Sequence, residues 1–324
     1  MTTYADVIIV GGGPAGSTCA WKLKKWGLDC LILDKQDFPR PKPCGGWLMP
    51  EVLEDLEIEA GDYPHSLMSF ERYNVHFKSF SLRLKSLQFA IRRHEFDNWL
   101  IERSTVPLIN YKVSDIRKEA GFYLIDDQYK CRYLVGAGGT NCPVYKTFFK
   151  SINPRSREQQ AVTMVEEFAY DNSSEDLHLW FSLNLLPGYA WYVPKSKGVI
   201  NVGIGSLTPR LQKNNDSLKN EWGQFIHKLA DLSLVKDYQF NPQGYVYYLR
   251  GNVDVVRLDN AFLVGDAVGL ATRDMAEGIG PAIKSGLLAA AAISEGTEYA
   301  LQTIKKYSSG HKLLNRFTEY FIAD

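Results

Sequence analysis

Hydrophobic residues at the start of the chain form two short unbroken runs, separated by a stretch with helical spacing. Residues 7–10 are β-branched and bounded by glycine, which is typical of a buried parallel strand. A helical pattern over residues 15–26 ends at Gly27, and a second apolar run at 31–33 precedes Asp34. This order predicts the strand–helix–strand unit of a doubly wound α/β sheet.

The turn between the first strand and the helix covers residues 11–16 and fits G-x-G-x-x-G. Gly11 permits the tight turn, Gly13 lets a pyrophosphate approach the backbone, and Gly16 lets the helix pack on the strand. The helix N-terminus presents free N–H groups to that pyrophosphate. Asp34, 18 residues after Gly16, is placed to accept hydrogen bonds from a ribose. Together these features predict a dinucleotide-binding unit.

The remaining pattern predicts an inserted lobe of different character. Residues 67–91 and 161–205 alternate between polar and apolar positions, with turn signals between the runs, as in antiparallel strands. A buried strand returns at 261–267, followed by an alanine-rich helix. We therefore expect an α/β fold with a Rossmann-type cofactor-binding domain and an inserted antiparallel-sheet substrate lobe. The expected ranges are 1–65, 92–150 and 250–310 for the first domain, 66–91 and 151–249 for the lobe, and 311–324 for a C-terminal helix.

Composition and charge exclude several classes of function. The 324 residues include 37 Lys and Arg against 37 Asp and Glu, so no overall basic charge favours nucleic acid. A strand begins within a few residues of the start, and no apolar run is long enough to span a bilayer. The five cysteines are scattered without a C-x-x-C pair, and the six histidines have no metal-ligand spacing. We expect a cytoplasmic protein without a metal.

Two further stretches are candidates for chemistry. The loop at residues 39–47 places Cys44 between a proline and two glycines, where thiol and backbone can both approach a ligand. By itself Cys44 could equally be a small buried hydrophobic residue. Tyr189 and Trp191 are two residues apart on an expected strand, so they share one face and can form the wall of a pocket. The alternative for this pair is ordinary packing in the core of a sheet.

These motifs resemble the flavoprotein superfamily built around p-hydroxybenzoate hydroxylase and, within it, the geranylgeranyl reductase family. The family motif P-x-x-x-x-C-G-G is present at residues 39–46. The motif Y-x-W-x-F-P is present at 189–194 with Val193 in place of phenylalanine, and G-x-G follows eight residues later at 203–205. Residues 265–267 match the Gly-Asp-Ala segment whose acid binds the ribityl chain of FAD in this family. The similarity covers nearly the whole chain.

The resemblance implies FAD as cofactor and reduction of C=C bonds in a prenyl lipid, with Cys44 as the catalytic residue. It also implies a hydrophobic small-molecule or prenyl-lipid substrate, an external electron donor (NAD(P)H, a ferredoxin or another reductase) and peripheral membrane contact. The expected cofactor contacts are Gly11, Gly13, Ala15, Gly16, Asp34, Lys35, Cys44, Gly45, Arg93, Val113, Gly265, Asp266, Gly278 and Ile279. The expected substrate contacts are Gly46, Tyr189, Trp191, Val193, Pro194, Gly203 and Gly205.

Two departures from the family pattern and one alternative function accompany this interpretation. Asp34 stands where the family usually has glutamate, and Gly138 stands where it usually has aspartate, so NAD(P)H binding at the Gly138 segment is in doubt. Residues 188–194 are also close to the halogenase segment G-W-x-W-x-I-P. The alternative is therefore a monooxygenase or halogenase that acts through a C4a-oxygen adduct. A flavin-binding sensor is a third class, but the chain has no output domain.

Overall fold

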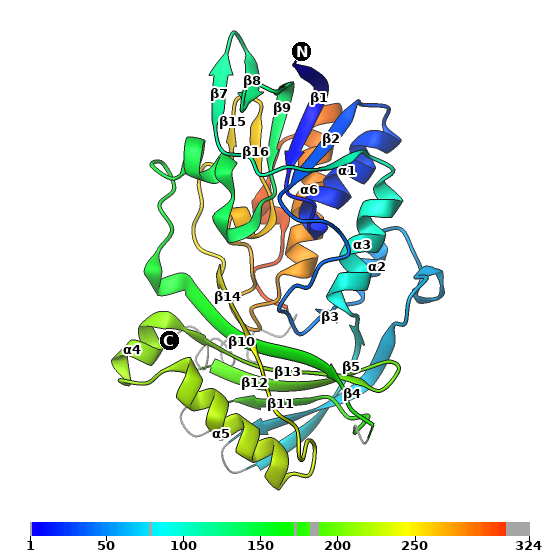
Figure 1. The fold of residues 1–324 in the computed structure, drawn as a ribbon, viewed down its shortest axis with the longest axis vertical. Coiled ribbons are helices and arrows are strands. Elements are labelled where there is room, and N and C mark those ends of the chain that lie inside the picture. Colours follow the sequence, from blue (N-terminus) through cyan, green and yellow to red (C-terminus); the bar gives the residue numbers. More distant parts are fainter. Residues whose placement is uncertain (1, 78–79, 172–173, 182–187, 309–324) are drawn as a thin grey trace.

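A computed structural model describes residues 2–77, 80–171, 174–181 and 188–308. The molecule has two parts, each built on an eight-stranded sheet: an α/β part in the upper half of Figure 1, and a sheet with short helices below it. The first sheet has the order β15-β16-β9-β1-β2-β6, and the β7–β8 hairpin extends it from β9. Its strands are β1 (Thr3–Val10), β2 (Cys30–Asp34), β6 (Leu108–Asn110), β7 (Ile116–Glu119), β8 (Phe122–Ile125), β9 (Tyr129–Gly136), β15 (Arg257–Leu258) and β16 (Ala261–Leu263).

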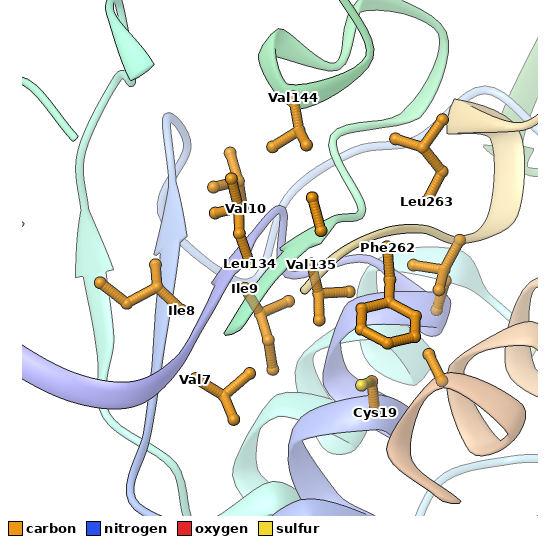
Figure 2. Packing of buried hydrophobic residues seen from close by; sticks show 14 of the residues in the cluster. Val7, Ile8, Ile9, Val10, Cys19, Leu134, Val135, Val144, Phe262 and Leu263 are labelled. Carbon is orange, nitrogen blue, oxygen red and sulfur yellow. The ribbon is translucent and has the colours of Figure 1, made fainter. Parts of the chain in front are cut away.

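The first sheet confirms the predicted parallel core. β1 pairs in parallel with β2 on one side and with β9 on the other, so it is covered at both edges. Its side chains from Val7 to Ile9 are fully buried, which explains the unbroken apolar run in the sequence. Figure 2 shows this core, where strand residues such as Ile9, Val135 and Phe262 gather close to Cys19 of the first helix.

Helices pack together on one side of this sheet and position the turn that follows β1 (Figure 1). They are α1 (Pro14–Lys25), α2 (Glu51–Asp55), α3 (Arg93–Ser104) and α6 (Ile279–Ser294). Helix α6 touches α1 through small residues: a Cβ on Gly286 would lie only 2.3 Å from the carbonyl oxygen of Ala15. This close contact keeps the start of α6 near the glycine-rich turn.

The second sheet has the order β14-β10-β13-β12-β11-β4-β5-β3, and helix α5 lies against its outer face (Figure 1). Its strands are β3 (Trp47–Leu48), β4 (Met68–Phe77), β5 (Phe80–Ala90), β10 (Gln160–Ala169), β11 (His178–Phe181), β12 (Gly188–Lys195), β13 (Val199–Leu207) and β14 (Gln243–Tyr248). The helices that follow β13 are α4 (Thr208–Lys213) and α5 (Leu218–Asp231). Trp222, Phe225 and Leu229 are buried on the inner side of α5.

One pairing corrects the prediction of a purely antiparallel lobe. β11 runs parallel to β4, with His178 opposite Asn74, whereas the other pairs in this sheet are antiparallel. The reason is that β4 and β11 are far apart in the chain, so no short hairpin fixes their relative direction. β3 also pairs with β5 and so belongs to this sheet, although its residues fall in the range expected for the first domain. The expected helix at 311–324 lies outside the described residues.

Within the described ranges, no helix combines the length and the apolar character needed to cross a lipid bilayer.

Candidate functional site

A cavity of about 810 Å³ lies between the two sheets. It begins at Val10 and Asp34, the carboxyl ends of β1 and β2, which is where open α/β sheets bind ligands. It ends against the inner face of β12 at Tyr189 and Trp191. The residues expected from the sequence that line it are Gly11, Gly13, Ala15, Asp34, Lys35, Cys44, Gly45, Gly46, Arg93, Val113, Tyr189, Trp191, Val193, Gly265, Asp266, Gly278 and Ile279. Four others, Gly16, Pro194, Gly203 and Gly205, do not line it.

The glycine-rich turn has the geometry of a ligand cradle. Gly11 has a φ of 118°, and a Cβ there would lie 2.4 Å from the oxygen of Ala137. A Cβ on Gly16 would lie 1.9 Å from the oxygen of Gly11, so Gly16 serves the packing of α1 on the turn and not the cavity. A Cβ on Gly13 would meet only Arg40 Nη2, at 3.5 Å. Gly13 therefore leaves room for a ligand to reach the backbone.

The Asp34 carboxylate holds this turn in place. Its Oδ2 accepts the N–H of Gly12 at 2.7 Å, and its Oδ1 accepts the N–H of Gln36 at 3.0 Å. The side chain also lines the cavity. Its position is therefore compatible with the expected ribose contact, while the hydrogen bonds that the structure shows are to the backbone.

Two cations outside the predicted site residues also line this cavity. Arg40 and Lys42 alternate with prolines in the loop after β2. Arg40 Nε is buried and has no hydrogen-bond partner in the described part of the chain. Lys42 Nζ lies 3.0 Å from the ring centre of Tyr245, and burial lowers the pKa of Lys42 to about 8. The sequence contains a pattern that predicts an anionic ligand here: two cations alternate with prolines directly after the second strand of the dinucleotide-binding unit.

Cys44 is half-buried beside a buried arginine. Gly46 donates its N–H to Cys44 Sγ at 3.3 Å, and the guanidinium of Arg93 interacts electrostatically with the thiol. Arg93 is held in turn by two bonds to Asp97, at 2.8 and 2.9 Å, one helical turn further along α3. Burial lowers the pKa of Arg93, but Asp97 and then Cys44 outweigh that effect and raise it overall. Positive charge is therefore fixed next to the sulfur.

Two buried polar residues of the second sheet, Lys195 and Asn201, form hydrogen bonds to the backbone of the loop that contains Cys44. Lys195 Nζ donates to the carbonyl oxygens of Gly45, Gly46 and Ile91. Asn201 Nδ2 donates to the carbonyl oxygen of Cys44 at 3.0 Å. Burial lowers the pKa of Lys195 to about 8. Neither residue is marked in the sequence, because each lies in a strand pattern without a motif of its own.

Replacing Lys195 by methionine is expected to loosen this loop. The carbonyl oxygens of Gly45 and Ile91 lose their donor, while that of Gly46 keeps the N–H of Ile91, so we expect the free energy of unfolding to fall by about 2–4 kcal/mol. Urea denaturation measures this loss. Lys197→Met is the matched control, because Lys197 is exposed two residues further along. Equal stability of the two variants would contradict a clamping role for Lys195.

The aromatic wall of the cavity rests on the glycines that follow it in the sequence. Trp191 donates from Nε1 to Asn201 Oδ1 at 2.9 Å, and the Tyr189 hydroxyl donates to the carbonyl oxygen of Met275 at 2.6 Å. A Cβ on Gly203 would lie 2.1 Å from the indole of Trp191. Gly203 is therefore the niche in which the ring sits, with Gly205 beside it. This corrects the expectation that the two glycines contact a substrate.

Pro194 is buried but absent from the cavity lining, whereas its neighbour Val193 lines the cavity. The reason is that successive side chains of a strand point to opposite faces.

The start of α6 brings a carboxyl group to the cavity. Gly278 and Ile279, which are expected cofactor contacts, line it, and so does Glu277. Glu277 Oε1 accepts the N–H of Gly280 at 2.6 Å. Burial raises the pKa of Glu277 to about 7, with Asp274 and Glu51 as smaller contributors in the same direction. The group therefore changes charge near neutral pH.

Replacing Glu277 by glutamine is expected to change how stability depends on pH. The folded pKa is about 7 against an ordinary 4.5, so the folded wild type loses stability as pH rises through this interval. Glutamine has no charge to bury. The variant should therefore match the wild type near about pH 4.5 and exceed it by up to about 3 kcal/mol near about pH 8. Urea unfolding at both pH values tests this, and parallel pH curves would contradict it.

Among the described residues, no group of three or more His, Cys, Asp or Glu side chains is arranged to hold a metal ion.

The chain is similar to proteins of several microorganisms. A model of the NAD(P)-binding Rossmann-like domain matches residues 9–80. An uncharacterized protein of Methanosarcina barkeri is 32% identical, with 89% of this chain and 74% of that protein covered. Menaquinone reductase of Mycolicibacterium smegmatis is 26% identical, with 93% and 79% covered. Digeranylgeranylglycerophospholipid reductase 3 of Methanosphaera stadtmanae is 26% identical, with 94% and 81% covered.

Solved structures agree on the fold. A geranylgeranyl bacteriochlorophyll reductase-like protein from Thermoplasma acidophilum superposes with a TM-score of 0.79 at 22% identity, with 98% of this chain and 83% of that one covered. A flavin-dependent brominase superposes with a TM-score of 0.69 at 18% identity, with 98% and 84% covered. The glycine turn, the Cys-Gly-Gly loop and these relatives lead to one conclusion. The chain belongs to one family with the Methanosarcina barkeri protein, and it is similar in sequence to digeranylgeranylglycerophospholipid reductases and in fold to flavin-dependent enzymes.

Proposed function

We propose that this chain binds FAD and reduces C=C bonds of a prenyl lipid. The residues present fit the cofactor: Gly13 leaves space at the backbone, Arg40 offers a buried unpartnered N–H, and Asp34 lies at the end of β2. A pyrophosphate at the start of α1 would lie against the backbone of Gly13 and accept the N–H of Arg40. Asp266 and Gly278 continue the same lining toward α6. A cavity that connects both ends suits an elongated dinucleotide.

The observation that carries the proposed reaction is the shared cavity. One continuous space joins the cofactor turn at Gly13 to the Cys44 loop and to the aromatic wall at Trp191. Reduced flavin, when bound, supplies a hydride. The protein then has to hold an apolar alkene against this wall and provide one proton.

Cys44 is the group that we assign to the proton. Cys44 lines the cavity, Gly46 donates its N–H to the sulfur, and the positive charge of Arg93 lies beside the thiol. The proton passes from Sγ to a substrate carbon, while the Gly46 N–H holds the sulfur in position. Lys195 and Asn201 keep the loop carbonyls bonded, so the thiol is presented from a fixed backbone.

The names of the relatives support a lipid substrate. Relatives at 26% identity are named for the reduction of digeranylgeranylglycerophospholipid and of menaquinone. Both names denote lipids with polyprenyl chains. The wall formed by Tyr189, Trp191 and Val193 is suited to an apolar chain of this kind.

Anaerobic stopped-flow on the flavin-reduced protein tests the proposal. We expect a geranylgeranylated lipid to reoxidise the flavin, followed by absorbance, and the product to carry two more hydrogens per reduced bond. No reoxidation by any polyprenyl lipid would exclude the reductase. A C4a-oxygen adduct formed with oxygenated buffer, together with silence toward alkenes, would favour the monooxygenase or halogenase instead. The same apparatus compares NAD(P)H with reduced ferredoxin as electron donor.

A further inference from the structure

The hairpin formed by β4 and β5 has a composition unlike the rest of the chain. The whole sequence has no net charge, yet residues 66–91 contain four cations, Arg72, Lys78, Arg83 and Lys85, against one acid, Glu71. Three of the large exposed hydrophobic side chains of the described chain also lie on β5: Phe80, Leu82 and Leu87 are 50%, 48% and 45% exposed. Cations and apolar groups are therefore gathered on one strand.

Strand register sorts these side chains onto two faces. Leu82 is opposite Val75 and Phe80 is opposite Phe77, so these residues share the face that looks toward the cavity. Lys85 is opposite Arg72 and Arg83 is opposite Asn74, on the other face. The hairpin is thus apolar on one side and basic on the other.

The apolar face is continuous with the candidate site. Ring centres are 4.9 Å apart between Phe80 and Phe77, and 5.6 Å apart between Phe77 and Phe181. A further 5.6 Å separates Phe181 from Tyr189, which lines the cavity. A row of aromatic rings therefore leads from the exposed edge of the sheet to the aromatic wall.

The outer edge of β5 is open. β3 pairs only with Phe89 and Ala90, and in the described part of the chain no other strand covers residues 80–87 on that side. Figure 1 shows the hairpin, in light blue, at the margin of the lower sheet. Pairing of this edge with a second copy is disfavoured, because it would bring the Arg83 and Lys85 side chains of two copies together.

We propose that this edge of the β4–β5 hairpin docks on an anionic lipid bilayer, with Phe80 and Leu82 entering the interface and Arg72, Arg83 and Lys85 meeting lipid phosphates. The two faces meet at the open edge of β5, where apolar side chains alternate with cations, so a bilayer that meets the strand edge-on contacts both, and this combination binds such surfaces. The exposed ion pair of Arg83 with Asp176, 3.3 Å long, is weak enough to yield to phosphates. This inference rests on the proposed lipid substrate, which the docked protein would take up beside the aromatic row.

Flotation of the full chain with vesicles tests the docking. Phosphatidylcholine vesicles with phosphatidylglycerol should bind the protein, those without it should bind weakly, and added salt should release it. Phe80→Ser with Leu82→Ser should weaken binding about tenfold or more. Lys85→Glu should weaken binding only to the anionic vesicles. Ile152→Ser is the matched control, because Ile152 is 48% exposed but follows Phe149, which is buried in the core of the first sheet.

Three results would contradict the proposed docking surface. The wild type could fail to bind the vesicles, or the Phe80/Leu82 variant could bind as well as the wild type. Light scattering could also show that the wild type is a dimer and that the variant is a monomer. A failure of the docking is distinguishable from a failure of the reductase. Reduction of a detergent-dispersed prenyl lipid needs no vesicle, so it reports on the proposed function alone. Vesicle flotation needs no turnover, so it reports on the surface alone.

Discussion

Replacing Cys44 by serine is expected to slow the reduction of a prenyl C=C bond by about 10²- to 10³-fold. The serine hydroxyl occupies the position of the thiol but is a far weaker acid, so transfer of the proton to the substrate carbon is slower. Gly46 N–H and Arg93 remain as partners for the new side chain. Anaerobic single-turnover reoxidation of the reduced flavin by a geranylgeranylated lipid measures the change.

The reaction with oxygen is the internal control for this variant. Oxidation of the reduced flavin by oxygen involves no alkene and therefore no proton transfer from Cys44 to carbon. The rate of this oxidation and the flavin content of the variant should stay near those of the wild type. The other four cysteines are buried, which leaves Cys44 as the thiol that a reagent in the cavity can reach. Alkylation should therefore reproduce the loss. An unchanged alkene rate in Cys44→Ser would show that the thiol only fills space.

Replacing Gly203 by alanine is expected to have the largest structural effect on the aromatic wall. The added Cβ would lie 2.1 Å from one indole atom of Trp191 and 2.4 Å from another, so the ring has to leave its niche. Overpacking of this kind costs about 1–3 kcal/mol or more. The indole also loses its bond to Asn201, which holds the Cys44 loop. We expect lower stability, changed tryptophan emission and at least about tenfold weaker substrate binding.

Gly205→Ala is the matched control on the same strand. There the new Cβ would meet Thr163 Cγ2 at 3.2 Å and the Trp191 ring at 3.8 Å, which small shifts can accommodate. Its unfolding and its emission spectrum should therefore stay close to those of the wild type. If both variants behaved alike, Gly203 would not be the niche for Trp191.

The sequence by itself determined the cofactor-binding unit. The signals for β1, the glycine turn, α1 and Asp34 are local, because all of them lie within residues 7–34 and follow one another in a fixed order. Gly11 and Gly13 accordingly lie where the spacing predicts. The motif around Cys44 likewise predicted a loop that reaches the cavity, since proline and glycine exclude regular structure there.

Only the tertiary structure decided what supports this site. Lys195 bonds to Gly45 from 150 residues away, and no local pattern marks a strand lysine as buried. The G-x-G segment looked like a ligand contact until the indole of Trp191 was seen to occupy the space above Gly203. The parallel pairing of β4 with β11 could not be predicted either, because the two strands are about 100 residues apart in the chain. Such contacts join segments far apart in the chain, so their free energy depends on packing that a local pattern does not contain.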